Sequence, residues 1–153
     1  MKEENKEEKE DVVAEMERRF TQEREDWRNK VANLAHKMRE VKGISEVQVN
    51  LYSERQLLIE YQHNLGQVLS RVLTKQKKLR KASLKKYSEN NDVKYGANEK
   101  TVLIEGDLSD VAQRVEIIEN HRKYIDQTVQ TVDHMLYGIR NRIELEKYLN
   151  GSI

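Results

Sequence analysis

A cluster of positive side chains occupies residues 71–86. Eight of these sixteen residues are Lys or Arg, and no Asp or Glu occurs between Tyr61 and Ser88. The whole chain carries a formal charge of only +1, so the rest of it is net acidic. Solvent-exposed helices usually interleave both signs, and a block of one sign therefore indicates a polyanionic partner. We expect that partner to contact Lys75, Lys77, Lys78, Arg80, Lys81, Lys85, Lys86 and Tyr87.

Single-stranded nucleic acid is one class of partner that suits these residues. Lysines that neutralise backbone phosphates release condensed counterions, which gives affinity without sequence preference. Tyr87, Tyr95 and Lys94 adjoin the cluster, and a tyrosine beside lysines is suited to stacking with unpaired bases.

Other partners fit the same charges. An acidic protein surface would neutralise the cluster, and so would the N-terminal glutamates of this chain, Glu3, Glu4, Glu7, Glu8 and Glu10. The helix macrodipole by itself also favours cations near a helix C-terminus. The alternative prediction is therefore a coiled-coil structural, adaptor or assembly scaffold protein that binds an acidic protein. A membrane surface fits less well, because the cluster lacks a broad face of Trp, Phe and Leu.

Residues typical of catalytic or metal sites are too scattered to predict an enzyme. The chain has no Cys, which excludes disulfides, thiolate metal sites and cysteine nucleophiles. His36, His63, His121 and His134 show no H-E-x-x-H or other ligand spacing. The glycines form no phosphate-binding loop, so we predict a protein without catalytic activity, metal or cofactor.

The hydrophobic spacing predicts long helices that position the cluster. The chain contains no Pro, and its apolar residues recur at alternating steps of four and three, as in a coiled-coil seam. The first seam, within a predicted amphipathic helix over 11–42, is Val13, Phe20, Trp27, Val31, Leu34, Met38 and Val41. The second has Ile44, Leu51, Leu58, Leu65, Val72 and Leu79 at a, and Val47, Glu54, Tyr61, Val68, Lys75 and Ala82 at d. Lys75 at d and Lys86 at a would weaken this second seam.

A polar segment predicts a break in the helices. Residues 88–98 are rich in Ser, Asn, Asp and Gly, so we expect a loop at about 88–107. The apolar run Thr101–Ile104 is either a short strand or an apolar plug on the helices. Asp107 or Ser109 is expected to cap a third helix that stops near Gly151. The third seam is Val111, Val115, Ile118, Arg122, Ile125, Val129, Val132, Leu136, Ile139 and Ile143.

These segments predict an all-α protein with a tail at 1–10, a helix at 11–42 and a helical domain at 43–152. The Glu- and Lys-rich tail is expected to be disordered. A helix from about 44 to 87 would be roughly 65 Å long, whereas a globule of this chain length has a radius of gyration of about 15 Å. We therefore expect a helical hairpin that assembles into an oligomeric bundle or ring, with a single-chain antiparallel three-helix bundle as the alternative.

No segment of the sequence predicts export or membrane insertion. The longest apolar runs are far shorter than the ~20 residues of a membrane span, and a secretory signal is not recognisable. We expect a cytoplasmic protein.

The sequence KASLKKYS at 81–88 resembles the basic DNA-binding motif of the UvsY family of T-even-type phage recombination mediators. The resemblance extends in order to Leu51-Tyr52-Ser53, to Lys100-Thr101-Val102-Leu103, and to a long helix that contains Ile139-Arg140-Asn141-Arg142-Ile143. The resemblance covers roughly residues 47–152. Residues 1–46 resemble an N-terminal extension relative to shorter members of the family.

Resemblance to this family implies a non-enzymatic protein that binds single-stranded DNA (ssDNA) in the cytoplasm of the host cell. Such proteins form hexameric or heptameric rings and help a RecA-like recombinase displace the single-strand-binding protein. Lys81 matches the first basic position of the family motif, whereas the second position falls on Ser83, which has no charge. We expect Lys85 and Lys86 to substitute for it.

Overall fold

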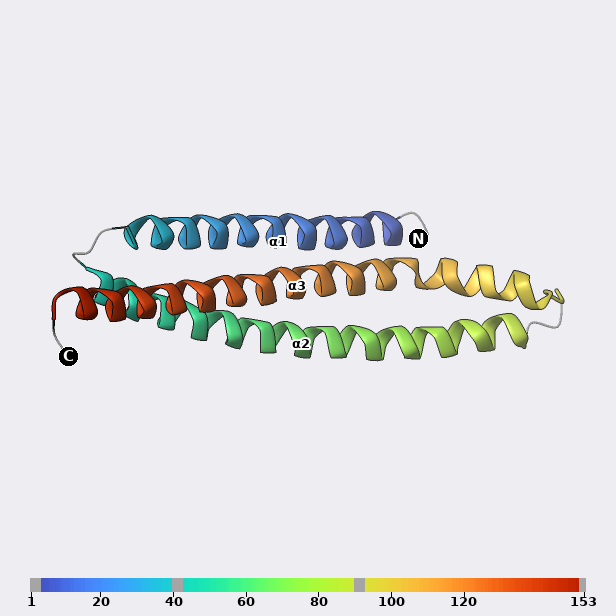
Figure 1. Ribbon diagram of the computed structural model, residues 1–153. Helices are drawn as coiled ribbons and strands as arrows, with labels where there is room; N and C mark the ends of the chain where they lie inside the picture. Colours follow the sequence, from blue (N-terminus) through green and yellow to red (C-terminus); the bar gives the residue numbers. More distant parts are fainter. Residues whose placement is uncertain (1–3, 40–42, 90–92, 152–153) are drawn as a thin grey trace. The chain divides into compact units, whose positions relative to one another are not determined.

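Three long helices form the part of the chain that the structure describes. The computed structural model describes residues 4–39, 43–89 and 93–151. Helix α1 spans Glu4–Lys37, α2 spans Ile44–Ser88 and α3 spans Ala97–Leu149 (Figure 1). The all-α prediction is confirmed. Over the described residues, no helix offers an apolar stretch long enough to cross a membrane.

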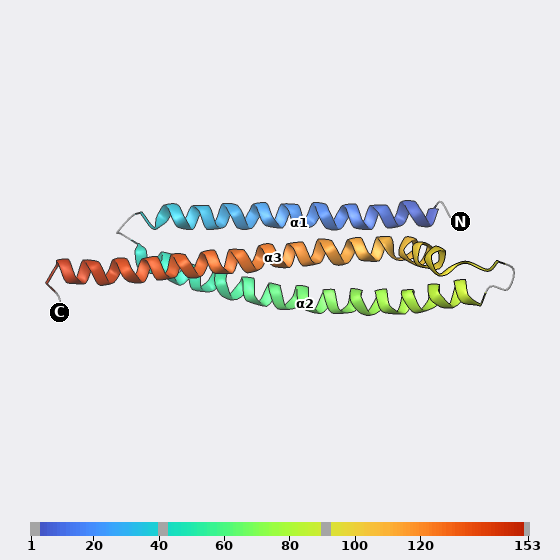
Figure 2. The ribbon, with the colours of Figure 1, turned by 45° about the vertical axis from the view of Figure 1, so that its right-hand side comes forward.

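Segments of these helices form two structural units. The first unit combines Met1–Arg19 with Leu65–His121, and the second combines Phe20–Asn64 with Arg122–Ile153. Each unit therefore contains one segment of every helix, and consecutive segments run in opposite directions (Figure 1). In the first unit, the end of α2 lies beside the start of α3 in both views (Figure 2). The basic cluster lies entirely in this first unit.

Each unit buries apolar side chains from all three helix segments. In the first unit the buried residues are Val13, Leu65, Leu69, Ile104, Leu108, Val111 and Ile118. In the second unit they are Phe20, Ile44, Val47, Leu51, Leu58, Ile125, Val132, Leu136 and Ile139. The predicted seams thus supply most of both cores. In α3, His121 and Thr128 are buried, whereas the predicted seam residues Arg122 and Val129 beside them are half-buried.

Polar side chains also join the helices of the second unit. Arg55 of α2 donates to Asp133 of α3, with Nε and Oδ1 2.5 Å apart. The Tyr124 hydroxyl donates to the backbone oxygen of Arg24 at 2.8 Å. The hydrogen bond to Asp133, and then the charge of its carboxylate, raise the pKa of Arg55.

Helix α3 begins earlier than the sequence predicts. The backbone N–H of Gly96 donates to Glu99 Oε2 at 2.8 Å, and the Gly96 carbonyl accepts from the N–H of Lys100 at 3.0 Å. This is the helix-capping arrangement in which an acid three residues on binds the N-cap N–H. The prediction of a loop up to 107, with a cap at Asp107 or Ser109, is therefore wrong. The run Thr101–Ile104 is helical and forms no strand, and its last residue, Ile104, is buried in the first unit.

Helix α1 also extends beyond its predicted start. It begins at Glu4, so the expectation of disorder is wrong for residues 4–10, and residues 1–3 lie outside the described chain. Val13 and Phe20 are buried, and the seam residues from Trp27 to Met38 are half-buried. The predicted seam residue Val41 lies outside the described residues.

After Leu65 the d positions of the α2 seam shift by one residue, whereas the predicted a residues Val72 and Leu79 stay half-buried in it. Up to Leu65 the predicted a positions are buried, but the predicted d residues Val68, Lys75 and Ala82 are exposed. Their C-terminal neighbours Leu69, Gln76 and Ser83 are buried or half-buried instead. An α-helix repeats every 3.6 residues, so a strict heptad drifts about 20° per repeat, and an extra four-residue step corrects the drift. Two consecutive steps of four, from Tyr61 to Leu65 and from Leu65 to Leu69, make this correction.

We expect Leu58→Ala to lower the free energy of unfolding by about 2–5 kcal/mol, because it opens a cavity in the core. Leu58 is fully buried, whereas its neighbour Leu57 is 49% exposed. Leu57→Ala is therefore the matched control, with an expected loss of about 0.5 kcal/mol or less. Urea unfolding followed by circular dichroism measures both. Equal losses would contradict the register of α2.

Candidate functional site

The basic cluster lies on the solvent-facing side of α2. We define it as Arg71, Lys75, Lys77, Lys78, Arg80, Lys81, Lys85 and Lys86, and all eight residues are exposed. Arg71, Lys75, Lys78 and Lys85 follow each other at steps of four, three and seven, so they share one face of the helix. The seam residues Leu69 and Ser83 are buried. The helix therefore presents its cations away from the core.

Lys75 and Lys86 do not occupy the seam. The sequence placed Lys75 at a d position and Lys86 at an a position, but both side chains are exposed. The shift after Leu65 puts Gln76 and Tyr87 in the half-buried positions beside them. The prediction that the cations weaken their own seam is therefore wrong.

Asp107 of α3 connects the end of the cluster to the helix that packs against it. Its Oδ2 accepts hydrogen bonds from the hydroxyls of Ser83, at 2.9 Å, and Tyr87, at 3.1 Å. Lys86 Nζ lies 3.6 Å from the same oxygen and donates to the Tyr87 hydroxyl at 3.0 Å. Three side chains of α2 thus meet around one carboxylate of α3.

The protonation of this group follows from its contacts. Burial raises the pKa of Asp107, but the hydrogen bonds from Ser83 and Tyr87 and the charge of Lys86 outweigh it, so that the pKa is lowered. The hydrogen bond with Tyr87, aided by the charge of Asp107, raises the pKa of Lys86. At neutral pH the carboxylate and the ammonium group are therefore both charged, and Asp107 neutralises part of the cluster.

One further cation of the cluster has an acidic partner among the described residues. Lys85 forms an exposed pair with Glu89 of its own helix, at 3.7 Å. Across the ranges that the structure describes, Lys85 and Lys86 are the cations of the cluster that form ion pairs. Such exposed pairs contribute little to stability, so a partner with several negative charges can compete with them.

The ring of Tyr87 is packed among its neighbours. Lys86 Nζ lies 4.6 Å from the ring centroid, and the ring of Tyr95 meets it edge-on, with the two centroids 5.8 Å apart. Tyr87 is half-buried and its hydroxyl is bonded to Asp107. These contacts fix the orientation of Tyr87.

Ser83 points into the first unit. It is 4% exposed and donates to Asp107, so it does not reach the solvent-facing surface. The two cations that we expect to substitute for it, Lys85 and Lys86, are exposed.

Asp107 is a neighbour of the basic cluster that the sequence does not predict. We expected it at a helix cap, whereas it lies inside α3. The apolar residues Ile104, Leu108 and Val111 continue the alternating steps of four and three toward the N-terminus, and all three are buried. Extending the seam through them would have placed Asp107 on the helix.

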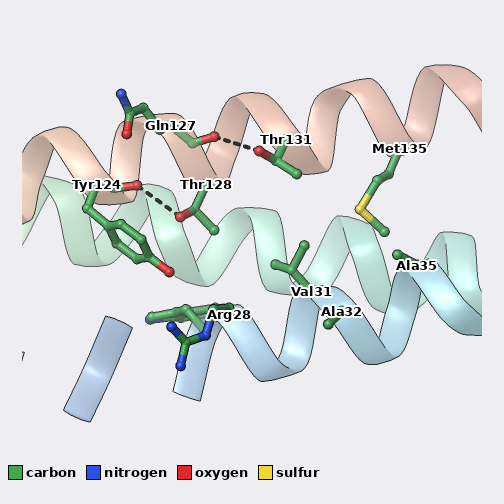
Figure 3. A pocket seen from close by; sticks show the side chains of 10 residues that line it. Arg28, Val31, Ala32, Ala35, Tyr124, Gln127, Thr128, Thr131 and Met135 are labelled. Carbon is green, nitrogen blue, oxygen red and sulfur yellow. Dashed lines mark hydrogen bonds between the residues drawn. The ribbon is translucent and has the colours of Figure 1, made fainter. Parts of the chain in front are cut away.

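A separate apolar cavity of about 430 Å³ lies between α1 and α3 in the second unit (Figure 3). Val31, Ala32 and Ala35 face Tyr124 and Met135 across it. The hydroxyls of Thr128 and Thr131 donate to backbone oxygens of their own helix, at 2.9 and 3.0 Å. They therefore direct their polar atoms to the helix, and the cavity offers no cluster of titratable groups.

Comparisons with known proteins find no significant match. No family model matches the chain, and no curated protein or solved structure matches it significantly. The resemblance to the UvsY family stays a prediction. Over the described residues, His, Asp and Glu side chains form no group of three that could bind a metal ion.

We expect Ser83→Lys to destabilise the protein, although it would place a cation where the family motif has one. The substitution removes the hydrogen bond to Asp107 and puts a charge in a buried position, with an expected loss of about 1–3 kcal/mol. Ala82→Lys is the matched control, because Ala82 is exposed, and its expected loss is about 0.5 kcal/mol or less. Urea unfolding of the two variants measures this difference. A smaller loss of unfolding free energy for Ser83→Lys than for Ala82→Lys would contradict the shifted seam.

The lowered pKa of Asp107 predicts a pH-dependent contribution to stability. The contribution is present above the ordinary carboxyl pKa of 3.8 and is lost as the pH falls through the lower folded value. Asp107→Asn removes the charge and keeps an oxygen that accepts hydrogen bonds. We expect the free energy of unfolding of wild type to exceed that of the variant by about 1 kcal/mol or less at pH 7. This difference should shrink below pH 3.8. Urea unfolding of both proteins from pH 7 to below pH 3.8 measures this difference in the free energy of unfolding. A difference that does not change with pH would contradict the prediction.

Proposed function

We propose that this chain is a non-enzymatic protein that binds ssDNA through the basic cluster and acts as a recombination mediator. One observation supports the binding step above all. Eight exposed cations lie on one helix segment, and that segment contains no acidic residue. The mediator role is inferred from the resemblance of residues 81–88 and their flanking segments to the UvsY family.

The form of the cluster suits a flexible single strand. From Arg71 to Lys86 the cations extend over roughly 20 Å of helix, at ~1.5 Å per residue. Most are lysines, which bind phosphates as point charges and without fixed geometry. A strand that follows this row gains affinity from counterion release at each phosphate, independently of base sequence.

Oligomer formation would strengthen the interaction. If six or seven copies assemble, as in the family, a strand bound by one copy meets the next at a high effective concentration. A strand that passes over several copies would be held in a path that differs from its path on the single-strand-binding protein. A RecA-like recombinase could then gain access to it. An acidic protein surface remains the competing partner for the same cations.

We expect the affinity for an oligothymidine to fall steeply with salt. If five to eight phosphates are contacted, log affinity should decrease with log salt at a slope of roughly −4 to −6. Replacing Lys77, Lys78 and Lys81 together by Gln should make this slope shallower by about 2, because each lost phosphate contact contributes ~0.7. Fluorescence anisotropy over a salt series measures both proteins.

A second triple variant controls for the overall charge. Lys37, Lys123 and Lys147 are exposed and lie outside the cluster, so their replacement by Gln changes the net charge equally. We expect this variant to bind like wild type. Equal loss in the two triple variants would locate the binding elsewhere. Absence of oligonucleotide binding at low salt would overturn the proposal and favour an acidic protein partner.

A further inference from the structure

An open apolar hollow lies at the start of α3. It has a volume of about 460 Å³ and is lined by Tyr95, Asn98, Glu99, Val102 and Leu103. This volume is within the range of small-molecule sites, roughly 300–1,000 Å³. Val102 is 68% exposed although its side chain is aliphatic. Covering this surface would remove apolar area from water, which is favourable.

Tyr95 joins the hollow to the basic cluster. Its ring meets the ring of Tyr87 edge-on, with centroids 5.8 Å apart and planes at 89°. The Tyr87 ring in turn carries the ammonium group of Lys86, 4.6 Å from its centroid. A strand whose phosphates lie along the cluster therefore has the hollow within reach of a neighbouring base.

The lining of the hollow favours an uncharged, planar group. Glu99 accepts a hydrogen bond from the N–H of Gly96, so the first turn of α3 is already occupied by a carboxylate. The negative charge of that carboxylate disfavours a phosphate there. The ring of Tyr95 and the aliphatic Val102 and Leu103 offer surfaces for stacking, and the amide of Asn98 can pair with polar atoms at a base edge.

We propose that this hollow binds one unpaired base of the strand whose phosphates the basic cluster holds. The inference rests on the proposed function and adds to it a base-binding site separate from the phosphate contacts. Tyr95 is the stacking residue. Tyr87, which Asp107 and Lys86 hold in place, is a positioning residue that supports Tyr95 from its edge.

Binding of two labelled oligonucleotides tests this inference. One is an oligothymidine, and the other is an abasic oligonucleotide of the same length, which retains the phosphates and lacks the bases. We expect wild type to prefer the oligothymidine by about 5- to 100-fold, since stacking on an aromatic ring contributes ~1–3 kcal/mol per base. Tyr95→Ala should bring this ratio close to one without changing the affinity for the abasic strand, and Tyr95→Phe should keep the ratio.

Leu84→Ala provides the matched control, because Leu84 is an exposed apolar residue of α2 that does not line the hollow. It should keep the wild-type ratio, and circular dichroism should show unchanged helicity in all variants. The base site is overturned if wild type binds both strands equally, if Tyr95→Ala keeps the ratio, or if it weakens both strands alike. In these cases the phosphate contacts, and with them the proposed function, still stand. If wild type binds neither strand, both proposals fail.

Discussion

The register of the α2 seam determines whether the cations of the basic cluster face the solvent or the core. The extra four-residue step at Leu65–Leu69 changes which positions of α2 face the core. Gln76 and Ser83 are half-buried and buried, while Lys75 and Lys86 stay exposed. A strict heptad would have directed two of the eight cations toward the core. Burying such charges without partners costs several kcal/mol each. The shift therefore lets one helix combine a packed seam with eight exposed cations.

Asp107 gives this cationic face a fixed end. Its carboxylate binds Ser83 and Tyr87 of α2 and lies beside Lys86, so it joins α2 to α3 through four side chains. Hydrogen bonds to a charged acceptor are stronger than neutral ones. The same contacts orient Tyr87, against whose ring Tyr95 packs. The end of the cluster is thus a defined surface rather than a set of independent lysines.

The two proposed contacts use different parts of a nucleotide. The cations of α2 suit the phosphates, which are the same in every nucleotide, and the hollow at the start of α3 suits a base. Glu99 separates the two functions, because its carboxylate occupies the first turn of α3 and opposes phosphate there. Such a division supports affinity without strong base preference, since every base has a face that can stack.

The sequence alone determined the helical fold and the composition of the candidate site. Apolar residues at alternating steps of four and three, without Pro, predict long helices because an α-helix brings such positions onto one face. The block of cations without acidic residues was equally visible. The polar residues around Gly96 are typical of a loop, yet α3 starts there because the N–H of Gly96 donates to Glu99 and caps the helix.

Which residues of α2 face the core, and which groups surround the cations, depends on how the helices pack. The one-residue shift after Leu65 depends on the packing of three helix segments against each other, since a 3.6-residue helix can correct its drift from the heptad at several points. The pairing of Asp107 with Ser83, Tyr87 and Lys86 joins residues about twenty positions apart. It forms because the end of α2 and the start of α3 lie side by side, a proximity that the spacing of neither segment specifies.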